Sequence, residues 1–217
     1  MQSHQLKFSK TAHYYTIGTP TPKVKNLWIC CHGYGQAANR FIYKFKEIEN
    51  ENTFIVAPEG LSRFYFGNTR HVGASWMTKS DRLTEIDDYC NWLDTIYDTF
   101  VPQLSPNIKI TFFGFSQGVA TIFRWIHARK RPCNHIIAWA GMIPEDISYL
   151  DMSNYWDNKT IIRVIGTSDE YLTPERLQSD NDFIKSQKIE AKLVQFEGKH
   201  VIDRPTLREV AKQLIVT

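Results

Sequence analysis

A serine flanked by glycines is the feature of this sequence with the clearest chemical meaning. It lies in the run Gly-Phe-Ser-Gln-Gly at residues 114–118, where an apolar, β-rich segment at Ile108–Phe113 meets a segment with helical spacing at Gln117–Arg131. A turn that joins a strand to a helix this sharply exposes the serine hydroxyl. Glycine is needed on both sides, because Cβ atoms there would collide with the neighbouring strand and helix. The pattern predicts that Ser116 is a nucleophile.

A serine hydroxyl is a weak nucleophile at neutral pH, so it needs a histidine base and a carboxylate that orients the base. We expect His200 to be the base, because it is the one histidine after Ser116 that follows the end of an expected strand. Asp169 follows the expected strand before that one and is the expected carboxylate, with its neighbour Glu170 as the alternative. The resulting order of serine, aspartate and histidine is the one that a strand-to-helix serine elbow requires.

An attacked carbonyl also needs two backbone N–H groups that stabilise its oxyanion. Gln117, directly after the nucleophile, is expected to supply one of them. The other is expected from Tyr34, in the loop His-Gly-Tyr-Gly at residues 32–35, where the glycines let the backbone turn an N–H inward. His32 precedes the nucleophile, so we expect it to fix this loop by a hydrogen bond.

The segments that must position these groups alternate between strand and helix. Apolar runs predict strands at 27–31, 53–57, 108–113, 135–140, 160–165 and 191–196, and helical spacing predicts helices near 36–49, 83–104, 117–131, 174–188 and 206–215. Two alternating segments, Gln5–Phe8 and His13–Ile17, predict an opening antiparallel hairpin. The fold class expected is therefore α/β, a mostly parallel central sheet with an N-terminal antiparallel hairpin and helices on both faces.

Length and composition agree with one ordinary domain over residues 1–217. Hydrophobic residues make up 42% and charged residues 23% of the 217 residues, and domains have roughly 100–200 residues. The formal net charge of +3 gives no electrostatic footprint for nucleic acid. No signal peptide or long apolar segment is present, which favours a cytoplasmic protein without stable membrane insertion. The sequence leaves open whether the chain forms a homodimer.

Three groups of residues are given ordinary structural roles. The four cysteines are expected to pack in the core, with the adjacent Cys30 and Cys31 on opposite faces of a strand. The cations at 124–131 are expected to be solvated near the C-terminus of their helix. Asp180 and Asp182 are expected to face solvent from the helix after Asp169.

The whole set of motifs resembles the α/β-hydrolase superfamily, and within it the small phospholipase/carboxylesterase family that includes the acyl-protein thioesterases. The residues that carry the resemblance are His32-Gly-Tyr-Gly35, Pro58-Glu-Gly60, Ser75-Trp76, Gly114-Phe-Ser-Gln-Gly118, Gly166-Thr-Ser-Asp169 and Gly198-Lys-His200. The resemblance implies the same roles for Ser116, Asp169, His200, Tyr34 and Gln117 as the residues themselves suggest. It departs at Tyr34 and Gln36, where family thioesterases commonly have leucine and aspartate.

The mechanism expected is acyl transfer to water through an acyl-enzyme on Ser116, without metal or cofactor. Residues 141–159 are too few for a large cap, so the site should be open. An apolar groove for the substrate is expected from Trp76, Phe64, Phe66, Met142 and Tyr171.

The sequence therefore predicts a serine carboxylesterase that cleaves short to medium acyl esters or thioesters as small-molecule substrates. Lysophospholipase and acyl-protein thioesterase are the nearest alternatives. A hydrolase-like module that binds a small ligand without turnover, and a peptidase on the same scaffold, are weaker ones.

Overall fold

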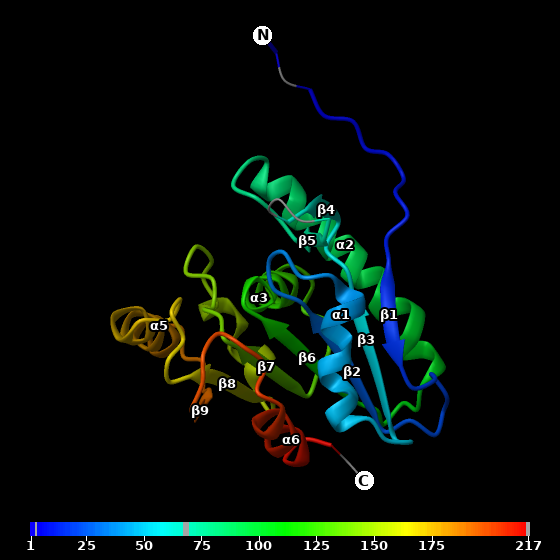
Figure 1. The fold of residues 1–217 in the computed structure, drawn as a ribbon, viewed down its shortest axis with the longest axis vertical. Helices are drawn as coiled ribbons and strands as arrows, with labels where there is room; N and C mark the ends of the chain where they lie inside the picture. The colour runs from blue at the N-terminus through cyan, green and yellow to red at the C-terminus, as the bar shows by residue number, and fades with distance from the viewer. Residues whose placement is uncertain (3, 67–69, 216–217) are drawn as a thin grey trace.

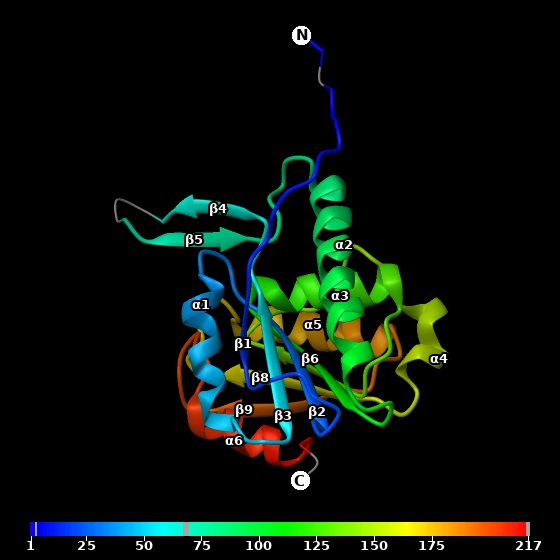
Figure 2. The ribbon, with the colours of Figure 1, turned by 90° about the vertical axis from the view of Figure 1, so that its right-hand side faces the viewer.

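The apolar segments form one central sheet, flanked by helices (Figures 1 and 2). The computed structural model describes residues 1–2, 4–66 and 70–215. Within these ranges, a seven-stranded sheet has the order β1-β3-β2-β6-β7-β8-β9. Its strands are β1 Tyr14–Ile17, β2 Asn26–Cys31, β3 Thr53–Pro58, β6 Lys109–Phe115, β7 His135–Trp139, β8 Thr160–Gly166 and β9 Lys192–Phe196. β1 pairs antiparallel with β3, and the other pairs are parallel. The expected α/β class is confirmed.

The helices cover both faces of the sheet. They are α1 Ala38–Phe41, α2 Arg82–Phe100, α3 Gln117–Arg129, α4 Ser153–Trp156, α5 Pro174–Ser186 and α6 Arg204–Lys212, with the 3₁₀ helices η1 Ile42–Ile48, η2 Val101–Gln103 and η3 Leu150–Met152. Residues of α2, α3 and α5 pack into one apolar cluster, and residues of α1, η1 and α6 pack into another on the opposite face. No helix in the described ranges is long and apolar enough to cross a membrane.

The side chains of β2 point alternately into the two apolar clusters. Leu27, Ile29 and Cys31 belong to the cluster under α2 and α3, whereas Trp28 and Cys30 belong to the cluster under α1 and α6. Successive side chains of a strand point to opposite faces, so a fully buried parallel strand is apolar throughout. The opposite placement of the two cysteines is confirmed, and both are buried free thiols.

The N-terminal antiparallel element is built differently in detail from the one expected. Residues 5–8 form no strand, and β1 pairs with β3 rather than with them. Leu6 and Phe8 are exposed on an arm that leads away from the body (Figure 1). β1 instead uses the outer edge of β3, where its Ile17 is buried. A second antiparallel pair, β4 Ser62–Tyr65 with β5 Val72–Ser75, projects from the main sheet (Figure 2).

The order of the strands brings two loops together. β2 lies between β3 and β6, so the chain leaves β2 toward one side of the sheet and later returns on its other side. The loops after β2 and β6 therefore meet at the carboxyl edge of the sheet, where α/β proteins of this type place their sites. These loops hold residues 32–35 and Ser116.

The expectation that Asp180 faces solvent is wrong. Asp180 is completely buried and pairs with Arg163, which is 3% exposed on β8. Its other carboxylate oxygen accepts the Ile143 N–H at 3.2 Å. Burial raises the pKa of Asp180 and lowers the pKa of Arg163, and the attraction between the two opposes both shifts. A buried arginine needs such a partner, because an unpaired charge in the interior is costly.

The cations near the C-terminus of α3 are ion-paired rather than merely solvated. Arg129 pairs with Asp87 and with Asp94, while Arg131 pairs with Asp94 and Asp98. These acids lie on α2, so the pairs link α2 to the end of α3. Salt bridges at this level of exposure stabilise a protein by only about 0–1 kcal/mol each.

Candidate active site

Ser116 occupies a strained turn between β6 and α3. Its φ of 53° and ψ of −116° lie outside the regions that ordinary residues adopt. A Cβ on Gly114 would come within 3.0 Å of the Gly118 carbonyl, and one on Gly118 would come within 3.0 Å of the Cys31 carbonyl. The two glycines are therefore needed where the sequence predicted them. Strain of this kind persists where the surrounding structure enforces it, and it is characteristic of functional sites.

The loop after β2 leaves one backbone N–H available beside Ser116. The Gly33 N–H donates to Gln36 Oε1 at 2.9 Å, and the Gly35 N–H donates to the Ala74 carbonyl at 2.9 Å. Among the residues that the structure describes, the Tyr34 N–H has no acceptor. A Cβ on Gly33 would lie 3.2 Å from the Ser116 Cβ, so this loop lies directly against the serine.

The first N–H of α3 is also available. In the described part of the chain, the Gln117 N–H has no backbone or side-chain acceptor, as is usual in the first turn of a helix. The side chain of Gln117 is engaged elsewhere, since its Nε2 donates to the Met77 carbonyl at 2.9 Å.

His32 is a buried anchor of the loop, as expected. The Gly60 N–H donates to its Nε2 at 2.9 Å, so the proton of the neutral ring is on Nδ1, which donates to the Gly33 carbonyl at 2.7 Å. The Trp76 Nε1–H donates to the carbonyl of His32 at 2.8 Å. Burial lowers the pKa of His32 to about 4, which keeps the ring neutral at physiological pH.

Asp169 and His200 meet at the ends of β8 and β9. The Asp169 Oδ2 lies 2.8 Å from His200 Nδ1, and the carboxylate is fully buried. Its Oδ1 accepts the Tyr171 N–H at 2.9 Å. The neighbouring Glu170 is exposed, so the geometry favours Asp169 over this alternative.

The rings of Phe115 and Tyr171 hold the imidazole of His200. Their centroids lie 5.0 Å and 4.7 Å from that of His200. Phe115 directly precedes Ser116 in the chain, so His200 lies near the serine turn. Since Nδ1 is hydrogen-bonded to Asp169, Nε2 is the nitrogen that can act as a base.

The residues expected to form a substrate groove differ in how far they are exposed and in what they contact. Phe64 and Phe66 form a cluster with Tyr34, whose ring centroid is 5.3 Å from that of Phe64 and 6.4 Å from that of Phe66. Met142 is half-buried. Trp76 is only 1% exposed, so its ring offers no surface to a substrate, and it supports the loop through its bond to His32.

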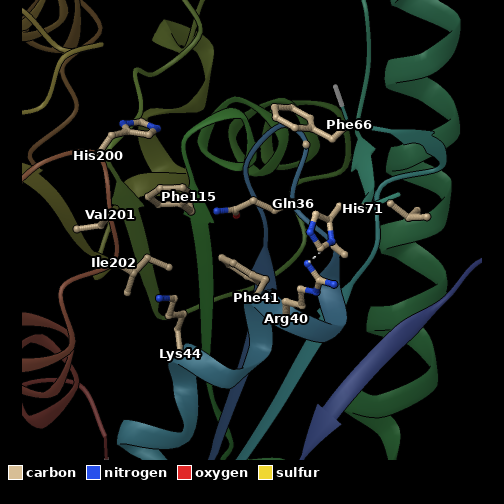
Figure 3. A pocket seen from close by; sticks show the side chains of 13 residues that line it. Gln36, Arg40, Phe41, Lys44, Phe66, His71, Phe115, His200, Val201 and Ile202 are labelled. Carbon is tan, nitrogen blue, oxygen red and sulfur yellow. Dashed lines mark hydrogen bonds between the residues drawn. The ribbon is translucent and has the colours of Figure 1, made fainter. Parts of the chain in front are cut away.

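A cavity of about 400 Å³ opens beside His200 (Figure 3). Of the expected groove residues, only Phe66 lines it. Its remaining side chains come from the end of the loop after β2, from α1 and η1, from β5 and its approach, and from the segment after β9: Gln36, Ala37, Arg40, Phe41, Lys44, His71, Val72, Phe115, Val201 and Ile202.

Sequence reasoning missed the two cations of this cavity. Arg40 and Lys44 are four residues apart in a segment expected to be helical, a spacing that places side chains on one face. The signal that could have found them was this shared face of the helical segment that follows the loop at 32–35.

The fold and this arrangement define a class, the α/β-hydrolases, in which a serine on a strand-to-helix turn faces a histidine and an acid from later strand ends. A model of the Phospholipase/Carboxylesterase family matches residues 12–217. The chain therefore belongs to the phospholipase/carboxylesterase family.

Solved structures with the same fold include hydrolases of this kind. Acyl-protein thioesterase 2 from Zea mays superposes with a TM-score of 0.71 at 16% identity, covering 94% of this chain and 98% of that one. A phospholipase/carboxylesterase from Dyadobacter fermentans gives a TM-score of 0.66 at 21% identity, covering 96% and 98%. Esterase PE8 gives 0.68 at 17% identity, covering 95% and 100%. At these identities the likeness shows the fold. No curated protein matches the sequence.

Proposed function

We propose that this protein is a serine carboxylesterase that cleaves short to medium acyl esters or thioesters. The observation that carries the proposal is the strained turn of Ser116. It is supported by the bond that holds His200 against Asp169 and by the N–H groups of Tyr34 and Gln117, which have no acceptor among the described residues. Family membership gives the reaction class, ester hydrolysis. The nature of the acyl group and of the leaving group is addressed by the experiments below.

In the first step, His200 Nε2 takes the proton of Ser116 as the Oγ attacks the ester carbonyl. Asp169 holds the imidazole in the required tautomer and stabilises its positive charge. The N–H groups of Tyr34 and Gln117 hydrogen-bond the oxyanion. His200 then protonates the leaving alcohol or thiol, and Ser116 carries the acyl group.

In the second step, water attacks the acyl-enzyme. His200 takes a proton from this water, the same two N–H groups stabilise the second oxyanion, and the proton returns to Ser116 as the carboxylic acid departs. Phe66 lines the cavity and packs with Tyr34, and Tyr171 packs against His200, so these rings are the ones that would offer apolar contacts to the substrate.

The test is hydrolysis of p-nitrophenyl esters of graded acyl length by the wild type and by Ser116→Ala, with circular dichroism to establish that both are folded. Replacing the nucleophile should lower kcat by about 10³-fold or more. A fluorophosphonate should label the wild type and leave the variant unlabelled, because labelling requires an activated serine.

Matched thioesters in the same series measure the preference for the leaving group. A folded wild type that hydrolyses no ester and takes no label would contradict the proposal and favour a non-catalytic binding module. Equal rates for the wild type and Ser116→Ala would also contradict it.

A further inference from the structure

The cavity beside His200 has a cationic side. His200 lies at its upper end, while Arg40 of α1 and Lys44 of η1 lie along its lower side (Figure 3). Of the residues described as lining the cavity, none is an aspartate or a glutamate. Its polar surface is therefore biased toward positive charge, although the chain as a whole has a net charge of only +3.

Neither Arg40 nor Lys44 forms an ion pair with any acid in the described residues. Most other arginines of the described residues do contact an aspartate or a glutamate: Arg63, Arg82, Arg124, Arg129, Arg131, Arg163, Arg204 and Arg208. The acid nearest in sequence, Glu47, is held by Arg204 and Arg208 on α6.

The guanidinium of Arg40 is oriented rather than simply solvated. Its Nη1 donates to His71 Nδ1 at 3.2 Å (Figure 3). An arginine has five N–H donors in a planar fork, so this bond leaves the other donors to an incoming group. A fixed guanidinium matches the geometry of a carboxylate or a phosphate better than a mobile ammonium does.

The wall between His200 and the cations is apolar. Phe41, Phe115 and Ile202 line this part of the cavity, and Phe41 and Ile202 are both largely buried. An apolar wall lowers the local dielectric, which strengthens the attraction between an anion and the cations. Arg40 and Lys44 are both exposed, so their charged ends lie where the cavity meets solvent and an anion can reach them.

We propose that the cavity selects esters that carry an anionic group, a carboxylate or a phosphate, on the part of the molecule that does not react. Arg40 and Lys44 bind this group, and the apolar wall takes the chain that connects it to the ester. This inference rests on the proposed esterase function and adds the chemical class of its substrate.

Two matched pairs of substrates test the inference. In one pair the charge is on the acyl half: p-nitrophenyl hydrogen glutarate against p-nitrophenyl methyl glutarate. In the other it is on the alcohol half: the butyrate ester of p-hydroxybenzoate against that of methyl p-hydroxybenzoate. The ratio of kcat/KM for the charged and the neutral member is measured for the wild type, Arg40→Gln, Lys44→Gln and the double variant.

Lys46→Gln is the control, because Lys46 lies on the same helix with its ammonium 5.2 Å from the Tyr43 ring, outside the cavity. We expect the ratio to fall about tenfold in Arg40→Gln and further in the double variant, because charge-assisted hydrogen bonds are lost. It should remain at the wild-type value in Lys46→Gln. The wild-type ratio should also fall as the salt concentration rises.

The pair that responds identifies which half of the ester occupies the cavity, and a response in either pair supports the inference. Unchanged ratios in both pairs for the double variant would overturn it while leaving the esterase proposal intact. A wild type that hydrolyses none of the four esters would overturn both proposals together.

Discussion

Acidification should destabilise this protein through His32. Burial lowers the pKa of this histidine from the ordinary 6.5 to about 4, so between these values the unfolded chain binds a proton that the folded protein excludes. The contribution of His32 to stability is complete above the pKa of the unfolded chain, and it is lost as the pH falls toward the lower pKa of the folded protein. One pKa unit corresponds to about 1.4 kcal/mol, so the loss between about pH 7.5 and about pH 5 comes to about 2 kcal/mol.

The assay is urea-induced unfolding at these two pH values for the wild type and for His32→Gln. Glutamine does not titrate, and its side-chain oxygen can accept the Gly60 N–H that His32 Nε2 accepts now. The free energy of unfolding of the wild type should fall on acidification by about 2 kcal/mol more than that of the variant.

Other buried groups that titrate contribute equally to the wild type and to the variant, so their effects cancel when the two losses of stability are compared. Burial and the charge of Lys109 also lower the pKa of His135, but His135 is present in both proteins. An equal loss of stability in the wild type and His32→Gln would refute the reasoning, since it would mean that the ring of His32 can accept a proton without leaving the folded structure.

Two further changes test the buried ion pair of Asp180 and the turn at Ser116. Asp180→Asn should lower the free energy of unfolding by about 3–5 kcal/mol, because the charge of Arg163 then remains buried without a partner. The double variant Arg163→Met with Asp180→Leu buries no charge and should lose much less. Urea unfolding of both variants measures the two losses, and equal losses would contradict the reasoning. Gly118→Ala should destabilise by about 1–3 kcal/mol, because its Cβ would press α3 away from the Cys31 carbonyl. It should also lower kcat for p-nitrophenyl butyrate, and a variant with unchanged stability and rate would show that the turn tolerates a side chain.

The fold could be predicted from the sequence because its signals are local. Apolar runs fix the buried strands, and helical spacing marks α2 and α3 to within a few residues. The glycines around Ser116 restrict the turn to one kind of geometry, which the structure has. Asp169 and His200 were placed by following strand ends, and the structure brings them within hydrogen-bonding distance of each other.

Features that depend on distant partners could not be predicted in this way. Asp180 looks like a surface residue of a helix, and only the buried position of Arg163 on β8 explains its burial. Trp76 looked like a wall of the site, but its indole N–H reaches the carbonyl of His32, which lies 44 residues earlier. The roles of Tyr34 and Gln117 remain predictions, which the available N–H groups support.

His200 follows β9, which lies at the edge of the sheet. β9 is the last strand, and four of its five residues are exposed or only half-buried. Backbone bonds from Thr167 to Phe196 and from Ser168 to Gly198 extend the β8–β9 ladder into the loops of Asp169 and His200. Edge elements with few buried contacts open at lower free energy than the core of a protein does. Hydrogen exchange should therefore be faster in β9 than in β2 or β6, and heating should abolish the proposed esterase activity before the central strands unfold.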